Sequence, residues 1–99
     1  MTEHQKIKAY KIAKHYGLRK QKIQACQELN ELSGVLLRRK DQIPNRADFI
    51  NSLIDEIADV YVMLEQLKSL YHLNDKDIYD RISFKLNRQI ERMAEEGAG

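Results

Sequence analysis

The sequence is poor in the residues that interrupt helices or cross-link a chain. Among its 99 residues there are one proline, four glycines and one cysteine. With so few turn residues and no run of alternating polarity, the pattern favours an all-α fold. The single cysteine, Cys26, excludes an intramolecular disulfide and suits a reducing cytosol. We expect it to be a small core residue.

The sequence also lacks a long apolar run and a strong excess of one charge. Its first residues have no apolar signal region, and no run approaches the length of a membrane-spanning helix. The 17 basic residues are nearly balanced by 15 acidic ones, so the net charge gives little reason to expect a nucleic-acid partner. These absences predict a cytoplasmic protein that binds neither membranes nor nucleic acid.

Helical periodicity is what the sequence does contain. Four helices are expected, at about residues 3–15, 18–39, 46–71 and 76–93. Gly17 is a C-terminal stop for the first helix, and Pro44 marks the clearest break because proline disfavours helix at the residue before it. The length predicts one domain over residues 1–99, with its core at about 15–93 and a frayed tail at 94–99.

The third expected helix is unusually apolar. Its apolar side chains cover half of the circumference or more at about 100° per residue. They are Ile50, Leu53, Ile54, Ile57, Val60, Tyr61, Met63, Leu64, Leu67, Leu70 and Tyr71. A helix on a protein surface needs a narrower stripe, so this one must be covered from two directions. We expect a homodimer or homotetramer, and favour third helices that pack together.

Two pairs of acids stand inside these apolar patterns. Glu28 and Glu31 belong to Glu-Leu-Asn-Glu, and Glu56 and Asp59 belong to Glu-Ile-Ala-Asp. The i,i+3 spacing places each pair on one face of its helix. Both pairs share their sector with apolar residues of the expected core, so all four acids are predicted to point inward. Ordinary surface acids offset by lysine and arginine are the alternative.

Bringing the two helices together would gather these four acids into one carboxylate cluster. Like charges this close raise one another's pKa and destabilise the fold unless cations neutralise them. Hard divalent ions such as Mg²⁺ prefer oxygen ligands of this kind. The two pairs therefore predict a metal site.

Around these acids the sequence resembles a known family. Glu-x-x-Glu is followed about 25 residues later by Glu-x-x-Asp, within Gln-Glu-Leu-Asn-Glu-Leu and Asp-Glu-Ile-Ala-Asp-Val. This combination is similar to the MazG-like all-α nucleoside triphosphate pyrophosphohydrolases, over about residues 15–92. The resemblance implies a four-helix bundle completed by dimerisation. It also implies a Mg²⁺-dependent hydrolase, with Mn²⁺ as a substitute, that cleaves a nucleoside triphosphate to the monophosphate and pyrophosphate.

The resemblance further implies roles for individual residues. The four acids of the carboxylate cluster match the metal ligands of the family. Glu28 and Glu31 are also the candidates to orient the attacking water or to take its proton. Gln27 replaces the first of two glutamates with which the family often begins this motif, and the number of bound metals stays open. Gln21 and Gln24 share the acidic face one to two turns earlier and are candidate substrate contacts.

A cationic ridge is expected on the last helix. Its members follow i, i+4, i+7, i+11 spacing and are Arg81, Lys85, Arg88 and Arg92. A solvated face partly neutralised by neighbouring acids is the alternative. In the functional interpretation the ridge and the carboxylate cluster hold a polyphosphate together, with Arg81, Lys85 and Arg88 as substrate contacts.

A different signal lies between residues 12 and 26. The spacing of a DNA-binding helix-turn-helix is reproduced by Ile12, Ala13, Gly17, Leu18 and Ile23, with Arg19, Lys20 and Lys22 available for phosphates. In that interpretation the recognition helix would continue into Glu28 and Glu31, which repel DNA. A small DNA-binding regulator or a non-enzymatic helical interaction protein is therefore the alternative to the hydrolase.

Overall fold

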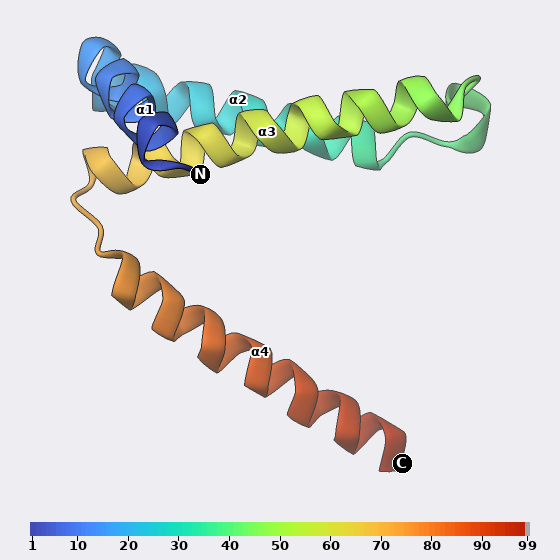
Figure 1. Cartoon of the computed structure of the whole chain (residues 1–99). Coiled ribbons are helices and arrows are strands. Elements are labelled where there is room, and N and C mark those ends of the chain that lie inside the picture. The colour runs from blue at the N-terminus through green and yellow to red at the C-terminus, as the bar shows by residue number, and fades with distance from the viewer. Residues whose placement is uncertain (99) are drawn as a thin grey trace.

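A computed structural model describes residues 1–98 of the chain. Within these residues there are four α-helices, one short 3-10 helix and no strand, which confirms the all-α prediction. The elements are α1 (Glu3–Tyr16), α2 (Leu18–Leu36), η1 (Lys40–Gln42), α3 (Arg46–Leu70) and α4 (Asp75–Ala98). Figure 1 shows α1, α2 and α3 packed together, whereas α4 extends away from them. We call α1–α3 the body and α4 the arm.

A single glycine separates α1 from α2. Thr2 begins α1 with a capping box, in which its hydroxyl accepts from the Gln5 N–H at 3.1 Å and the Gln5 side chain accepts from the Thr2 N–H at 2.8 Å. Gly17 follows α1 with φ 84° and ψ 167°, a conformation that is open almost only to glycine. The predicted stop at Gly17 is confirmed, and α2 begins at the next residue.

The connection between α2 and α3 differs from the prediction at one end. α2 ends at Leu36 rather than near Arg39. Arg39 lies instead in the loop, where its Nε pairs with Asp41 Oδ1 at 3.2 Å and so stabilises the non-helical turn. α3 begins at Arg46 as predicted, because the Asn45 side chain accepts hydrogen bonds of 2.8 and 3.2 Å from two N–H groups of the first turn.

A small core holds the body together, with α3 in contact with both α2 and α1. Its buried apolar side chains are Ala9, Ala13, Ala25, Val35, Val60 and Met63. Cys26 is exposed, so the prediction of a core cysteine is wrong. Successive helical residues differ by about 100° in direction, and on α2 it is Ala25 that faces the core.

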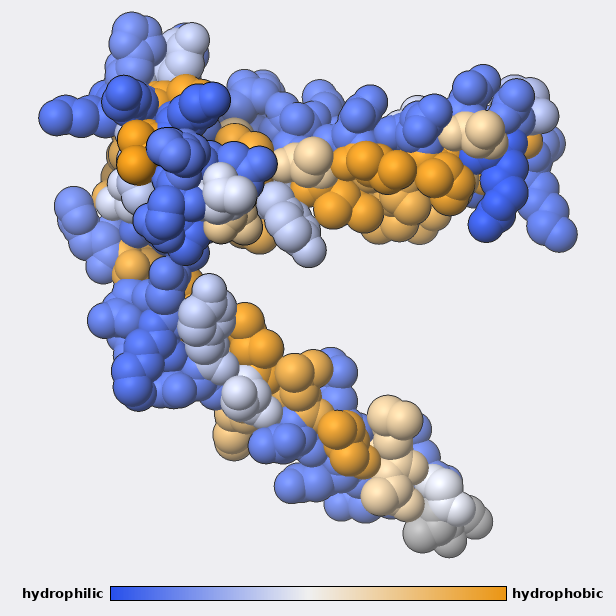
Figure 2. Space-filling view, viewed as in Figure 1, coloured by the Kyte–Doolittle hydropathy of each residue, from blue (hydrophilic) through white to orange (hydrophobic). Residues whose placement is uncertain are grey.

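α3 keeps a wide apolar face that the body does not cover. Ile54 is 58% exposed, Tyr61 64% and Leu64 49%. Figure 2 shows an apolar stripe along α2 and α3, on the side of the body that faces the open angle to α4. This exposed face is consistent with the predicted need for cover from a second direction. The homo-oligomer that would supply the cover stays a prediction.

The arm is longer and more isolated than the sequence suggested. α4 continues to Ala98 instead of fraying from residue 94, because Ala94, Glu95 and Glu96 all favour helix; Gly99 lies outside the described residues. Beyond its junction with α3, the described part of α4 packs on no other helix. A four-helix bundle is therefore not formed within one chain. None of the helices in residues 1–98 is long and apolar enough to cross a lipid bilayer.

Candidate metal centre

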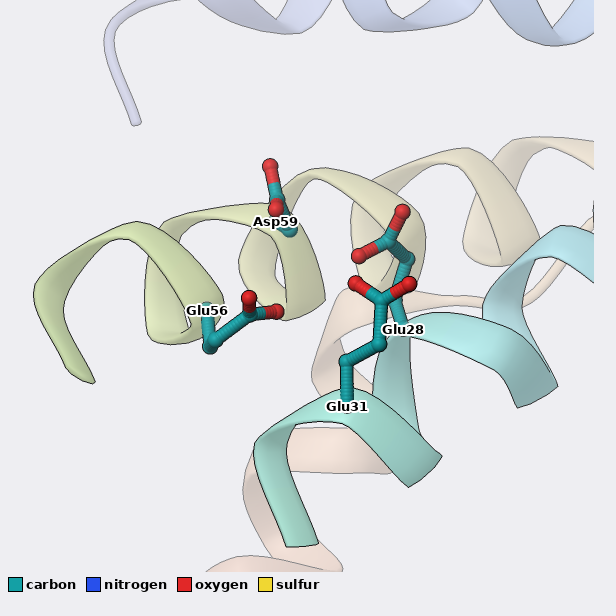
Figure 3. A group of neighbouring side chains, drawn as sticks. All are labelled: Glu28, Glu31, Glu56 and Asp59. Carbon is teal, nitrogen blue, oxygen red and sulfur yellow. The ribbon is translucent and has the colours of Figure 1, made fainter. Parts of the chain in front are cut away.

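The structure brings the two predicted acid pairs together. α2 supplies Glu28 and Glu31, α3 supplies Glu56 and Asp59, and one carboxylate oxygen of each lies within 4.8 Å of the others. Figure 3 shows the four side chains meeting between the two helices, two from each. The antiparallel packing of α2 on α3 sets this arrangement, because it places one turn of each helix opposite the other.

Two of these carboxylates carry oxygens that the protein leaves unsatisfied. Glu28 and Glu56 are half-buried, and the Oε2 atom of each is buried without a hydrogen-bond partner. An unpaired buried polar atom is costly, and a native structure usually satisfies it with protein, water or an ion. Glu31 and Asp59 are exposed. The carboxylate cluster is therefore closed on the core side and open to solvent on the other.

Within the described residues, none of these acids forms an ion pair with a cationic side chain. Partial burial, with the charges of the neighbouring Glu28 and Asp55 carboxylates, raises the pKa of Asp59 above its ordinary 3.8. The explanation of these acids as surface charges paired with lysine or arginine is thus not supported.

The donor set fits a hard divalent cation. Oxygens on opposite sides of an octahedral Mg²⁺ are about 4.2 Å apart, since each lies about 2.1 Å from the ion. The cluster spans up to 4.8 Å, so small side-chain rotations suffice to close it around one ion. Four carboxylates exceed the charge of a single divalent ion, which leaves room for a second one.

The two predicted glutamines occupy different positions. Gln24 Nε2 donates to Glu28 Oε1 at 2.8 Å and so orients one carboxylate of the cluster. Gln21 is only 5% exposed, and its Nε2 donates to Gln66 Oε1 at 2.7 Å inside the core. Gln21 therefore has a packing role, and its position does not support the prediction that it contacts substrate.

The cationic ridge does not reach the cluster of its own chain. Arg81, Lys85 and Arg88 are exposed on the arm, which packs on neither α2 nor α3. The prediction placed ridge and cluster around one polyphosphate, and one chain alone does not bring them together. The cause is the direction in which α4 leaves the end of α3 (Figure 1).

A polar network that the sequence analysis missed joins the body to the arm. Tyr10 of α1 donates from its hydroxyl to Glu65 Oε1 at 2.8 Å. Lys68 Nζ lies 2.9 Å from Glu65 Oε2 and 2.6 Å from Oδ1 of Asp75, the first residue of α4. The i,i+3 pair Glu65 and Lys68 inside an apolar helix was the available signal. We call these four residues the junction network.

The junction network shifts the pKa values of its members. Burial alone would raise the pKa of Glu65, but the hydrogen bonds from Lys68 and Tyr10 outweigh it, and the pKa falls below the ordinary 4.5. The hydrogen bond to Asp75 raises the pKa of Lys68. Glu65 is 8% exposed, so its charge is stable there only because Lys68 and Tyr10 compensate it.

The geometry around Gly17 argues against a helix-turn-helix. Such motifs join their helices by a turn of about three to four residues, whereas one residue separates α1 from α2. One of the basic residues assigned to phosphate contacts, Lys20, lies over the Tyr16 ring with its Nζ 4.5 Å from the centroid. α1 and α2 instead meet at a tight corner.

Comparison with known proteins adds no identification. The chain matches no protein-family model, and no significant similarity is found to curated proteins or to solved structures. The family resemblance therefore stays a prediction, and the carboxylate cluster is the feature of the structure that bears on function.

Proposed function

We propose that the protein is a Mg²⁺-dependent nucleotide pyrophosphohydrolase, which cleaves a nucleoside triphosphate to the monophosphate and pyrophosphate. The observation that carries the proposal is the carboxylate cluster: four acids from two helices, two unsatisfied buried oxygens and no cationic partner in the described chain. Clustered carboxylates that remain charged need divalent cations, and such cations bind the phosphates of nucleotides. The protein is further proposed to be a cytoplasmic homodimer or homotetramer.

Each member of the cluster has a proposed role. All four acids would hold the metal, which would neutralise phosphate charge and lower the pKa of a bound water. The half-buried Glu28, fixed by Gln24, or the exposed Glu31 orients the attacking water and takes its proton. Glu31 and Asp59 line the solvent side of the cluster, where a triphosphate would enter.

The cationic ridge is the proposed phosphate clamp. Lys85 and Arg88 stand in register on the arm, and Arg81 precedes them by one turn. Charged donors bind phosphate oxygens more strongly than neutral ones do. The clamp requires an arm that lies against a carboxylate cluster. Within one chain, the arm does not reach the cluster.

A non-enzymatic helical interaction protein is the second candidate. The exposed apolar faces of α3 and α4 favour it, because soluble proteins usually cover contiguous apolar surface with a partner. The two candidates are compatible in structure and differ in chemistry. Only the hydrolase needs the carboxylate cluster to remain charged and to bind metal.

The experiment that tests the proposal is pyrophosphate release from a panel of common and modified nucleoside triphosphates, with and without Mg²⁺. We expect Mg²⁺-dependent release from at least one of them, and loss of release in Glu56→Gln. Glu95→Gln, which removes the same charge from an exposed site on the arm, is the matched control and should keep wild-type activity. Absence of metal-dependent release from every triphosphate would overturn the proposal.

A further inference from the structure

A buried pair of glutamines joins α2 to α3 inside the core of the body. Gln66 is 2% exposed and Gln21 is 5% exposed, and Gln21 Nε2 donates to Gln66 Oε1 at 2.7 Å. A buried amide is costly unless it is hydrogen-bonded, whereas two apolar side chains at the same positions would carry no such requirement. The two amides therefore indicate a role that apolar packing does not supply.

The glutamine pair and the carboxylate cluster follow one and the same register of α2 on α3. Gln21 precedes Glu28 by seven residues on α2, and Gln66 follows Asp59 by seven residues on α3. Seven residues are two helical turns to within about 20°, so each glutamine projects in nearly the same direction as the acid on its own helix. Because α2 and α3 run antiparallel (Figure 1), the register that joins the glutamines also brings the acids together, about 10.5 Å further along the helices.

Apolar packing between α2 and α3 does not select this register by itself. The buried apolar residues of α2 are Ala25 and Val35, whose short side chains give the contact little shape. The apolar face of α3 covers half of its circumference or more, so it offers a similar surface to α2 after a slip along the axis. The loop over residues 37–45 is long enough to absorb such a slip. Several registers would therefore bury a similar apolar surface.

The glutamine pair distinguishes between these registers. A slip of four residues, one turn, would set Gln66 opposite Ala25 in one direction and opposite Gly17 in the other, and neither has a polar side chain. A slip of three residues would bring Gln24 to Gln66, but this contact would compete with the hydrogen bond of 2.8 Å from Gln24 to Glu28. A buried polar pair that fixes helix register is well attested in coiled coils.

A change of register would also dismantle the carboxylate cluster. A slip of four residues moves one helix past the other by about 6 Å. The ligand oxygens of the cluster all lie within 4.8 Å of one another, so a displacement of this size would separate the acids of α2 from those of α3. The position of the glutamines thus decides whether four carboxylates face one ion.

We propose that the hydrogen bond between Gln21 and Gln66 is the register key of the carboxylate cluster. It selects the register of α2 and α3 in which the four acids converge and hold a divalent cation. Gln21 and Gln66 are positioning residues, because they act through the register and not by contact with the ion. The link to a cation rests on the proposed function, whereas the selection of the register stands without it.

Replacement of both glutamines by methionine tests the register directly. Methionine has nearly the length and shape of glutamine but no amide, so Gln21→Met with Gln66→Met keeps the core filled. Spin labels at Cys26 of α2 and at Asn51→Cys of α3, both exposed positions, report the distance between the helices. We expect one narrow distance distribution with the glutamines and a broader or shifted one without them. An unchanged distribution would overturn the proposal.

A Mg²⁺ titration followed by thermal unfolding tests the link to the metal centre. Loss of both partners of a buried hydrogen bond can be neutral for stability, so the metal-free methionine variant should unfold near the wild-type temperature. It should nevertheless bind Mg²⁺ roughly 10–100-fold more weakly, as is usual when the support of metal ligands is lost. A pair with a merely structural role would change the metal-free stability and leave the affinity for Mg²⁺ unchanged. Gln89→Met, the same exchange at an exposed site on the arm, is the matched control and should retain both properties.

The two measurements separate the register key from the proposed function. If the methionine pair does not fold, Gln21→Leu with Gln66→Leu repeats both measurements with another apolar pair. An unchanged affinity for Mg²⁺ in the folded variant, beside a wild type that binds Mg²⁺, would overturn the link between the glutamines and the cluster. A wild type that binds no Mg²⁺ overturns the metal centre and the proposed function instead, while the distance between the labels still decides whether the glutamines select the register.

Discussion

The body and the arm differ in how far their apolar side chains are buried. Met63 on α3 is 7% exposed, whereas Met93 on α4 is 67% exposed. Both helices have an apolar face at helical spacing, so the difference lies in the presence of a neighbour and not in the helix itself. Hydrophobic periodicity therefore identified both helices but could not say what covers each of them.

The two regions also differ in whether their acidic side chains have cationic partners. The body gathers four acids, and none of the ion pairs among residues 1–98 includes one of them. The arm neutralises one of its acids locally, since Lys76 Nζ lies 2.7 Å from Asp80 Oδ2 one turn away. An exposed i,i+4 pair of this type contributes about 0.3–0.5 kcal/mol. Asp80 of the arm thus has a local cationic partner, whereas the four acids of the carboxylate cluster have none among the described residues.

The largest expected effect separates the function of the body from its stability. Glu56→Gln should lower the rate of pyrophosphate release by about 10²–10³-fold, because a preorganised charge at the reacting centre is lost. The same change should leave the metal-free protein as stable as the wild type or more so, since it relieves repulsion with the neighbouring acids. Steady-state kinetics and metal-free thermal unfolding measure the two effects. A loss of thermal stability alongside the loss of activity would contradict the account.

The second prediction compares the two methionines. Met63→Ala should lower the free energy of unfolding by about 2–5 kcal/mol, because it opens a cavity in the core of the body. Met93→Ala should change it by less than about 0.5 kcal/mol when the chain is dilute and monomeric, and by more at concentrations where copies associate. Denaturant titrations at two protein concentrations measure this. Equal, concentration-independent losses would show that the arm packs within its own chain.

The third prediction concerns the pH dependence of the junction network. The pKa of Glu65 is lowered in the folded protein from 4.5, so its stabilising contribution is present above about pH 4.5 and is lost as the pH falls through the folded value. Glu65→Gln should therefore be less stable than the wild type at pH 7, with a difference that shrinks in acid. Thermal unfolding between pH 3 and 7 measures this, with Glu95→Gln as control. A constant difference across this range would mean that Glu65 is not compensated as described.

The smallest expected effect lies between the two regions. His72 has φ 55°, in the left-handed region that costs a non-glycine residue about 1–2 kcal/mol. His72→Gly removes that strain but adds freedom to the unfolded chain, so we expect a gain in the free energy of unfolding of no more than about 1 kcal/mol. Calorimetry measures it. A clear loss of stability would show that the imidazole makes a stabilising contact.

Local signals in the sequence were enough for most of the body. Gly17 placed the end of α1 and the Pro44 break placed the start of α3 correctly, because each residue acts on its own backbone. The i,i+3 spacing put each acid pair on one face of its helix, and the apolar residues in the same sector predicted that both faces point inward. The end of α2 was missed because an ion pair between Arg39 and Asp41 stabilises the loop.

Properties that depend on tertiary contacts could not be predicted in the same way. Gln21 lies on the acidic side of α2 by spacing, yet Gln66 draws it into the core. Cys26 and Ala25 are adjacent in sequence, and only the packing of the body decides which is buried. The cationic ridge was a pattern on one helix, and its separation from the cluster depends on the direction in which α4 leaves the end of α3.

Binding of Mg²⁺ to the carboxylate cluster tests the central claim most directly. Thermal unfolding should be followed as Mg²⁺ is titrated into the wild type and into the double variant Glu28→Gln with Glu56→Gln. A ligand that binds only the folded state adds about 2.7 kcal/mol of stability at a hundred times its Kd. The account predicts a saturable rise of the unfolding temperature in the wild type and little or none in the double variant. An equal rise in both proteins, or no rise in either, would contradict it.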